Sequence, residues 1–233
     1  MLKLLSKTPQ DLRVIRGPFK GARMFLNPAN SKRKIFGLYE HCLNSWLAEV
    51  PPKKDFAFDV GSNTGYDLYG LAHLLSNGNQ REATVVGFEP EAADFPELTT
   101  PLKWPDYSMC RIEIIEKFAG AENTSSTITL DSAYSERPFL SGKSGLMKID
   151  VEGAEIEVLK GAQNLLNDTK HDWLIEIHGS HLISRVCEFF VERSRPFLVK
   201  DLAPLPILGK ERRSIDTYWL LTIKGEQGVD PNA

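Results

Sequence analysis

Short apolar runs alternate with amphipathic stretches along most of the chain, and this alternation limits the fold more than any other feature. Runs rich in β-branched and aromatic residues between turn signals are typical of strands. Stretches with apolar residues on one helical face predict helices. Strands alternating with helices indicate an α/β protein whose mostly parallel sheet is covered on both faces. The predicted strands are 56–60, 84–88, 111–118, 146–151, 173–177 and 218–223, and the predicted helices are 66–75, 155–166 and 180–193.

The chain has 233 residues, which suits one domain with a modest extension. Before the first of these strands, residues 14–26 predict a small hairpin, and residues 32–50 predict one helix that ends at Pro51 and Pro52. We therefore expect an N-terminal cap at 1–50, the main domain at 51–225 and a disordered tail at 226–233.

Charge and composition exclude several classes of protein. The net charge of −3 argues against a nucleic-acid binder, which needs a basic face. The basic clusters at 32–34 and 210–213 are interpreted as solvated surface. Three separated cysteines without CxxC spacing predict free thiols in a reducing compartment. No apolar run approaches the roughly 18 residues of a membrane span, and the apolar patch at 2–5 is too short for a signal peptide, so we expect a cytoplasmic protein.

The loop that follows the first of these strands carries the most informative motif. The strand runs into Asp59, then into Gly61, Asn63 and Gly65, and then into a helix. Glycines let the backbone turn sharply and approach a ligand, and the helix points its first amides at that ligand. Asn63 replaces the middle glycine that a bound pyrophosphate requires, which argues against a dinucleotide. The D-x-G-x-N-x-G pattern is typical of class I methyltransferases, which use it to hold the methionine part of S-adenosylmethionine.

The second of these strands ends at Glu89, followed by Pro90, which turns the chain away. A carboxylate at this strand end matches two adjacent ribose hydroxyls in nucleoside-binding Rossmann folds. The spacing of 28 residues from Gly61 leaves room for the helix and its return loop.

Acidic residues gather where the strand at 146–151 ends. Asp150, Glu152 and Glu155 should lie beside the ligand, because ligands bind at the carboxyl ends of parallel strands. The residues leave two roles open, a general base and a Mg²⁺ site of oxygen ligands at Asp150. Glu155 also suits the first turn of its helix without any role in the site. Lys148, on the strand itself, needs an acidic partner or access to the surface.

Glu176 and His178 alternate onto one side of the next strand. His178 is a candidate base or substrate contact, and a structural role is the alternative.

With these motifs placed, the chain resembles the FkbM family of methyltransferases. The matching segments follow the family order from about residue 35 to residue 180, and the Lys-Ile-Asp-Val-Glu-Gly-Ala-Glu string is the most specific. The segments are 37–40, 59–66, 88–90, 129–131, 148–155, 159–162 and 176–178.

The resemblance implies a Rossmann-like class I methyltransferase fold with a seven-stranded sheet, and S-adenosylmethionine as cofactor. It implies that Tyr39 and Glu40 close over the methionine end and that Asp131 joins Asp150 and Glu152 in an acidic site. Ser62 stands where family members often have alanine, and residues 119–126 lack the acid that many class I enzymes place near adenine. The cofactor-binding positions carried over are Tyr39, Glu40, Asp59, Gly61, Ser62, Asn63, Gly65, Glu89 and Pro90.

We therefore expect methyl transfer to a hydroxyl oxygen of a sugar or natural-product-like small molecule. Asp150, Glu152 and His178 are the predicted catalytic residues, with Asp150 or His178 as the base. Residues 14–50 and 132–144 are expected to shape the acceptor pocket. The sequence leaves the oligomeric state open. The alternatives are an NAD- or nucleotide-binding oxidoreductase and a non-catalytic partner protein that keeps the cofactor pocket.

Overall fold

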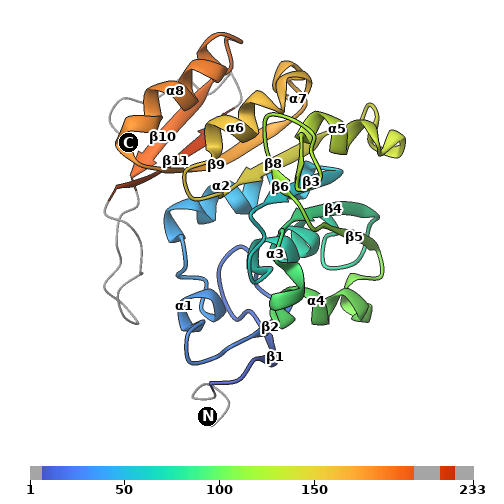
Figure 1. Cartoon of the computed structure of the whole chain (residues 1–233). Helices are drawn as coiled ribbons and strands as arrows, with labels where there is room; N and C mark the ends of the chain where they lie inside the picture. Colours follow the sequence, from blue (N-terminus) through green and yellow to red (C-terminus); the bar gives the residue numbers. More distant parts are fainter. Residues whose placement is uncertain (1–6, 202–215, 224–233) are drawn as a thin grey trace.

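A seven-stranded sheet forms the centre of the computed structural model, which describes residues 7–201 and 216–223 (Figure 1). The strand order is β10-β11-β9-β8-β3-β4-β5. β11 is antiparallel to both of its neighbours and every other pair is parallel, so six strands run in one direction. The predicted α/β, Rossmann-like architecture with a mostly parallel sheet is confirmed. The strands are β3 (Phe56–Val60), β4 (Ala83–Phe88), β5 (Cys110–Ile115), β8 (Gly145–Ile149), β9 (Asp172–His178), β10 (Phe197–Asp201) and β11 (Thr217–Thr222).

Helices cover both faces of the sheet and give the domain two apolar layers (Figure 1). One layer packs α3 and the N-terminal segment against the sheet, and the other packs α5, α6, α7 and α8 against the opposite face. Such coverage explains why β3, β4 and β8 are buried along their whole length. The helices are α1 (Lys32–Ile35), α2 (Asn44–Glu49), α3 (Tyr66–Leu75), α4 (Pro96–Thr99), α5 (Leu130–Ser135), α6 (Glu155–Lys160), α7 (Gln163–Asn167) and α8 (Ser180–Val191).

Two charged residues interrupt the apolar layer on the α3 side of the sheet. Asp59 on β3 and Lys148 on β8 are direct neighbours in the parallel register. Both are almost completely buried. A buried charge is costly unless it is paired, so these two residues mark the part of the sheet that is built for something other than packing.

The N-terminal segment forms a cap that differs from its prediction. β1 (Gln10–Arg13) and β2 (Arg23–Leu26) make the expected hairpin. The single helix predicted over 32–50 is wrong, because the chain breaks between α1 and α2. Gly37 has a φ of +64° and packs so closely on residues 16 and 17 that a Cβ would lie 2.3 Å from the carbonyl oxygen of Arg16. Contact with the hairpin therefore overrides local helix propensity.

The helix predicted over 155–166 also divides, into α6 and α7. A Cβ on Gly161 would lie 2.0 Å from the carbonyl oxygen of Gly120, so the chain turns here to pass a neighbouring loop. The two carboxylate oxygens of Asp131 accept the backbone N–H groups of Asn164 and Leu165 at 2.9 and 3.1 Å. Asp131 thus caps the start of α7.

Three further segments complete the comparison with the sequence. β10 is an unpredicted edge strand, and the predicted loop at 132–144 includes the end of α5. The pair β6 (Phe118–Ala119) and β7 (Thr127–Ile128) forms a separate short ladder.

The predicted tail at 226–233 and the basic cluster at 210–213 lie outside the described residues. All three cysteines are free thiols, and no helix among the described residues has the length and apolar character needed to span a membrane.

Candidate active site

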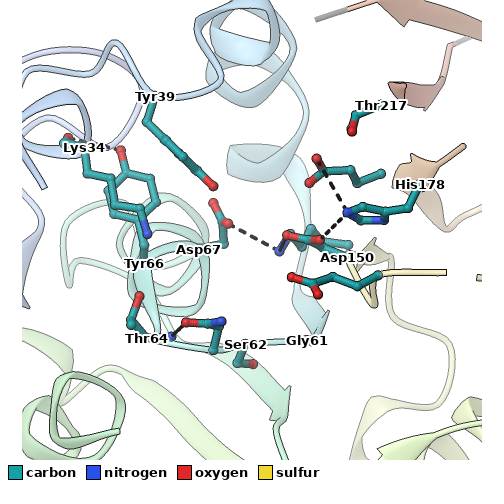
Figure 2. Close-up of a pocket in the computed structure, with 14 residues that line it drawn as sticks. Lys34, Tyr39, Gly61, Ser62, Thr64, Tyr66, Asp67, Asp150, His178 and Thr217 are labelled. Atoms are coloured by element: carbon teal, nitrogen blue, oxygen red, sulfur yellow. Dashed lines mark hydrogen bonds and ion pairs between the residues drawn. The ribbon is translucent and has the colours of Figure 1, made fainter. Parts of the chain in front are cut away.

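A pocket of about 460 Å³ opens at the carboxyl ends of β3, β8 and β9, with the N-terminal cap forming one wall (Figure 2). Its volume falls in the range of about 300–1,000 Å³ that is usual for small-molecule sites. The lining is mostly polar, with acids from several elements. The lining residues are Lys34, Tyr39, Gly61, Ser62, Asn63, Thr64, Tyr66, Asp67, Lys148, Asp150, Glu152, Glu176, His178 and Thr217.

The glycine loop between β3 and α3 lines one side of the pocket. A Cβ on Gly61 would lie 1.8 Å from the carbonyl oxygen of Asp150, so only glycine lets the loop after β3 lie against the loop after β8. Asn63 and Gly65 have φ values of +45° and +77°, and Gly65 precedes the first turn of α3. The loop therefore brings its backbone to the pocket at a helix N-terminus, as its sequence predicts.

Lys148 holds the acidic part of the site together. Its Nζ lies 3.5 Å from Asp59 Oδ1, 3.3 Å from Asp67 Oδ2 and 3.3 Å from Asp150 Oδ2. The expectation that this lysine needs acidic partners is confirmed. Neither carboxylate oxygen of Asp59 has a hydrogen-bond partner among the described residues, and burial raises the pKa of Asp59 to about 7 against the opposing charge of Lys148.

His178 is held at the end of β9 by a buried acid from α6. Its Nδ1 lies 2.8 Å from Oε1 of Glu155, which is fully buried and also accepts the backbone N–H of Gly153. An ionised carboxylate only accepts hydrogen bonds, so this contact assigns the proton to Nδ1. Nε2 then carries the free lone pair and lies 3.6 Å from Asp150 Oδ1 and 3.9 Å from Glu176 Oε1 (Figure 2).

The acids around His178 also set its charge. Burial alone would lower the pKa of His178, but the hydrogen bond to Glu155 and the negative charges of Asp150, Glu155 and Glu152 outweigh burial and raise it. Glu155 therefore orients the ring and makes Nε2 a stronger base.

Glu89 supports the glycine loop and does not line this pocket. Its Oε2 accepts the backbone N–H of Asn63 at 2.8 Å, and its Oε1 accepts the backbone N–H of Glu91 at 3.2 Å. Each oxygen retains a second lone pair. The side chain that is predicted to bind ribose thus also fixes the position of Asn63.

The structure brings together most, but not all, of the predicted site residues. The three predicted catalytic residues, Asp150, Glu152 and His178, all line the pocket. Glu152 has a φ of +47°, which turns the chain out of β8. Tyr39, Gly61, Ser62 and Asn63 line the pocket as well, whereas Glu40, Asp59, Gly65, Glu89 and Pro90 do not line it.

Two expectations about the pocket need correction. Asp131, which the family resemblance placed with the acidic site, is instead the cap of α7. The acceptor loops were expected at 14–50 and 132–144, but among the described residues only the first of these segments contributes to the lining, through Lys34 and Tyr39.

Sequence reasoning missed several lining residues, and Lys34 is the most informative of them. The cluster at 32–34 was interpreted as solvated surface, yet the Lys34 side chain enters the pocket. Asp67 and Tyr66 follow directly from the glycine loop and could have been inferred from their place in the first turn of α3. Thr217 reaches the site only because β11 pairs with β9, and no sequence signal marks it.

Three lining residues could hold a metal ion. One ligand atom from each of Asp150, Glu176 and His178 lies within 4.8 Å of the other two. Asp150 was the predicted metal ligand, and the structure adds a carboxylate and an imidazole beside it.

Comparison with known proteins gives this geometry a family context. Residues 111–195 match the family model described as the methyltransferase FkbM domain. This range contains β8, β9, Glu155 and His178, and it leaves out the glycine loop. A hexuronic acid methyltransferase, AglP, from Haloferax volcanii is 30% identical over 152 residues. That alignment covers 57% of this chain and 60% of the relative, so the similarity spans less than two thirds of the relative's length.

Solved structures show the same fold. Methyltransferase FkbM from Methylobacillus flagellatus aligns with a TM-score of 0.53 and 18% identity, covering 81% of this chain and 54% of that one. A precorrin 8W decarboxylase from Methanobacterium thermoautotrophicum aligns with a TM-score of 0.51 and 16% identity, covering 81% and 90%. At these identities the likeness concerns the fold alone.

Proposed function

We propose that the chain transfers a methyl group from S-adenosylmethionine to a hydroxyl oxygen of a sugar-like small molecule. The match of residues 111–195 to the methyltransferase FkbM domain and the similarity to a hexuronic acid methyltransferase support this proposal. The observation that carries this proposal is that His178, oriented by Glu155, faces the same pocket as the glycine loop. A base and a cofactor cradle in one cavity are the two parts that such a transfer requires.

The residues present fit the proposed cofactor. Asp150, Glu152 and Glu176 give the pocket an acidic wall, which suits the sulfonium and ammonium groups of S-adenosylmethionine. Gly61, Asn63 and Gly65 would hold the methionine part, and Glu89 would accept hydrogen bonds from the ribose hydroxyls. When bound, the cofactor supplies a methyl group on a sulfonium, which is already electrophilic.

His178 is the base that the geometry favours. Asp150 has the ammonium of Lys148 at 3.3 Å, which stabilises its ionised form and weakens it as a proton acceptor. Nε2 of His178 has no such cation beside it among the described residues, and the surrounding acids stabilise the imidazolium that forms when it takes a proton. His178 would therefore accept the proton of the acceptor hydroxyl, while Asp150 and Glu152 would orient that hydroxyl.

Magnesium fits this donor set poorly. Mg²⁺ prefers oxygen ligands, whereas one of the three candidate ligands is an imidazole, and Lys148 already supplies a positive charge next to Asp150. We propose that turnover does not depend on Mg²⁺, so that activity persists after dialysis against EDTA.

The class of acceptor is proposed from the relative and from the pocket. The name of AglP identifies a hexuronic acid as that protein's substrate. A polar pocket with carboxylates and a threonine suits the hydroxyls of a sugar better than an apolar ring. We therefore propose a sugar or sugar acid, rather than another kind of natural product, as the methyl acceptor.

The test is a transfer assay with S-adenosylmethionine and a panel of D-glucose, D-glucuronate and their methyl glycosides. Formation of S-adenosylhomocysteine together with an acceptor heavier by one methylene would support the proposal. A His178→Gln variant should bind S-adenosylhomocysteine but lose most of its turnover, because it removes the proposed base. Binding of the cofactor product without transfer to any member of a broad acceptor panel would favour the non-catalytic alternative.

A further inference from the structure

One cation in the pocket has no role in the chemistry above. Lys34, from α1, lies on the wall formed by the N-terminal cap, across the pocket from His178 (Figure 2). Its Nζ lies 4.8 Å from the ring centroid of Tyr39 and 4.9 Å from that of Tyr66. The two rings meet edge to face at 5.6 Å, and the Tyr66 hydroxyl donates to the Lys34 backbone carbonyl at 3.1 Å. These contacts hold the ammonium in one place.

Lys34 differs from Lys148 in what surrounds its charge. Lys148 has three aspartates within 3.5 Å, whereas no carboxylate of the described residues lies within ion-pair distance of Lys34 Nζ. Burial lowers the pKa of Lys34, although the more distant charges of Asp67 and Glu40 oppose that effect. An ammonium that is held over two rings and has no ion-pair partner among the described residues gains most from a bound anion.

The charge of the remaining lining limits which anion fits. The pocket contains two lysines against the four carboxylates Asp67, Asp150, Glu152 and Glu176. Lys148 is already engaged by Asp67 and Asp150, so Lys34 is the one lysine of this lining left for an anion. A phosphate dianion would meet strong repulsion from the acids, whereas a single carboxylate on a ligand that is otherwise cationic or neutral would not.

We propose that Lys34 is the receptor for a ligand carboxylate in this pocket. The inference rests on the proposed function, which offers two sources of that group. One is the amino-acid carboxylate of S-adenosylmethionine, whose ammonium and sulfonium would face the acidic wall. The other is the carboxylate of a sugar-acid acceptor. Lys34 would thus fix the orientation of whichever molecule carries the acid.

Calorimetric titration with two matched ligand pairs tests the proposal. The first pair is S-adenosylhomocysteine and its decarboxylated analogue. The second pair is D-glucuronate and D-glucose, titrated into protein saturated with S-adenosylhomocysteine. The proteins are the wild type, Lys34→Met, and Lys32→Met as a control from the same basic cluster that does not line the pocket. Methionine keeps the length of the lysine stem and removes the charge.

In the wild type, we expect the acid of at least one pair to bind about tenfold or more tightly than its partner, because a charge-assisted hydrogen bond has about that effect. Lys34→Met should abolish this preference and Lys32→Met should retain it. If Lys34→Met loses the acid preference in the first pair, Lys34 binds the carboxylate of the cofactor. If it loses the preference in the second pair, Lys34 binds the carboxylate of the acceptor.

Two results would contradict these proposals, and the titrations distinguish one from the other. If the wild type binds S-adenosylhomocysteine but shows no acid preference in either pair, or one that Lys34→Met leaves unchanged, the carboxylate receptor is refuted and the proposed function stands. If the wild type does not bind S-adenosylhomocysteine at all, the proposed function itself fails.

Discussion

The two ends of the central sheet contain similar residues arranged for different purposes. At the amino end of β9, Lys54 pairs with Asp172 at 2.5 Å and donates to the backbone carbonyl of Lys170. His171 accepts the backbone N–H of Gly145 at Nδ1, and Arg195 donates to three backbone carbonyls. Each of these four side chains meets a fixed protein partner, which is how buried polar groups stabilise a fold.

At the carboxyl end the balance is different. Lys148 faces three aspartates, the buried carboxylate of Asp59 accepts no hydrogen bond from the described residues, and four carboxylates line an open cavity. Such an excess of acids weakens the fold unless a cationic ligand binds, so this end of the sheet is organised for a ligand. The comparison teaches that the number of fixed partners separates structural charges from functional ones more clearly than burial does.

The sharpest test of this contrast is to substitute one histidine at each end of the sheet, in two separate variants. His178→Gln should lower kcat by about 10²–10⁴-fold, because it removes the proposed base. His171→Gln should leave kcat unchanged below its unfolding temperature, because His171 contacts only the fold. Steady-state transfer assays on both variants measure this, and equal losses of kcat would remove the distinction.

The next largest effect concerns stability. Lys148→Met should lower the free energy of unfolding by about 3–5 kcal/mol, because it leaves three aspartates, of which Asp59 is fully buried, without their shared cation. Lys54→Met should cost less, about 1–3 kcal/mol, since Asp172 is partly exposed and retains the hydrogen bond from Thr222. Urea unfolding at pH 8 compares the two. A larger loss in Lys54→Met would mean that the structural ion pair, and not the acidic cluster, dominates stability.

A third prediction uses pH. Burial lowers the pKa of His171 to about 4, against an ordinary value near 6.5 in the unfolded chain. Between these values the unfolded chain binds a proton that the folded protein does not, so stability falls as the pH drops from about 6.5 to about 4, by about 3 kcal/mol in total. His178 has a raised pKa and acts in the opposite direction. The difference between wild type and His171→Gln in thermal unfolding across this pH range isolates the His171 contribution, and a constant difference would contradict it.

The smallest expected effect is a displaced pH profile. Glu155→Gln keeps a hydrogen-bond acceptor for His178 but removes the negative charge that raises its pKa. The acidic limb of the kcat/KM profile should therefore move to lower pH, with a smaller loss of kcat than His178→Gln causes. Glu157→Gln, on the exposed side of the same helix, is the control. An unmoved acidic limb would exclude His178 as the group that titrates.

These tests also show which parts of the site the sequence could predict. Local patterns predicted β3, β4, α3 and the glycine loop, because each is encoded within a few consecutive residues. The acidic residues at the end of β8 were predicted to lie beside the ligand because ligands bind at the carboxyl ends of parallel strands, and His178 was predicted as a base or substrate contact.

What the sequence did not reveal depends on contacts between distant segments. The helix break at Gly37 arises from its packing on residues 16 and 17, and the break at Gly161 arises from the loop at Gly120. The edge strand β10 is largely exposed and lacks a clear apolar alternation. Lys34 enters the pocket because α1 lies against the first turn of α3, where the Tyr66 hydroxyl donates to the Lys34 carbonyl. The pairing of Glu155 with His178 crosses 23 residues.

The central claim, that the carboxyl end of the sheet binds S-adenosylmethionine, is tested most directly by titrating S-adenosylhomocysteine into the wild type and a Glu89→Ala variant by calorimetry. Glu91→Ala, two residues further on in an exposed position, is the matched control. The account predicts micromolar affinity in the wild type and in the control, and a loss of at least about tenfold in Glu89→Ala. Absence of binding to the wild type, or equal affinity in all three proteins, would contradict it.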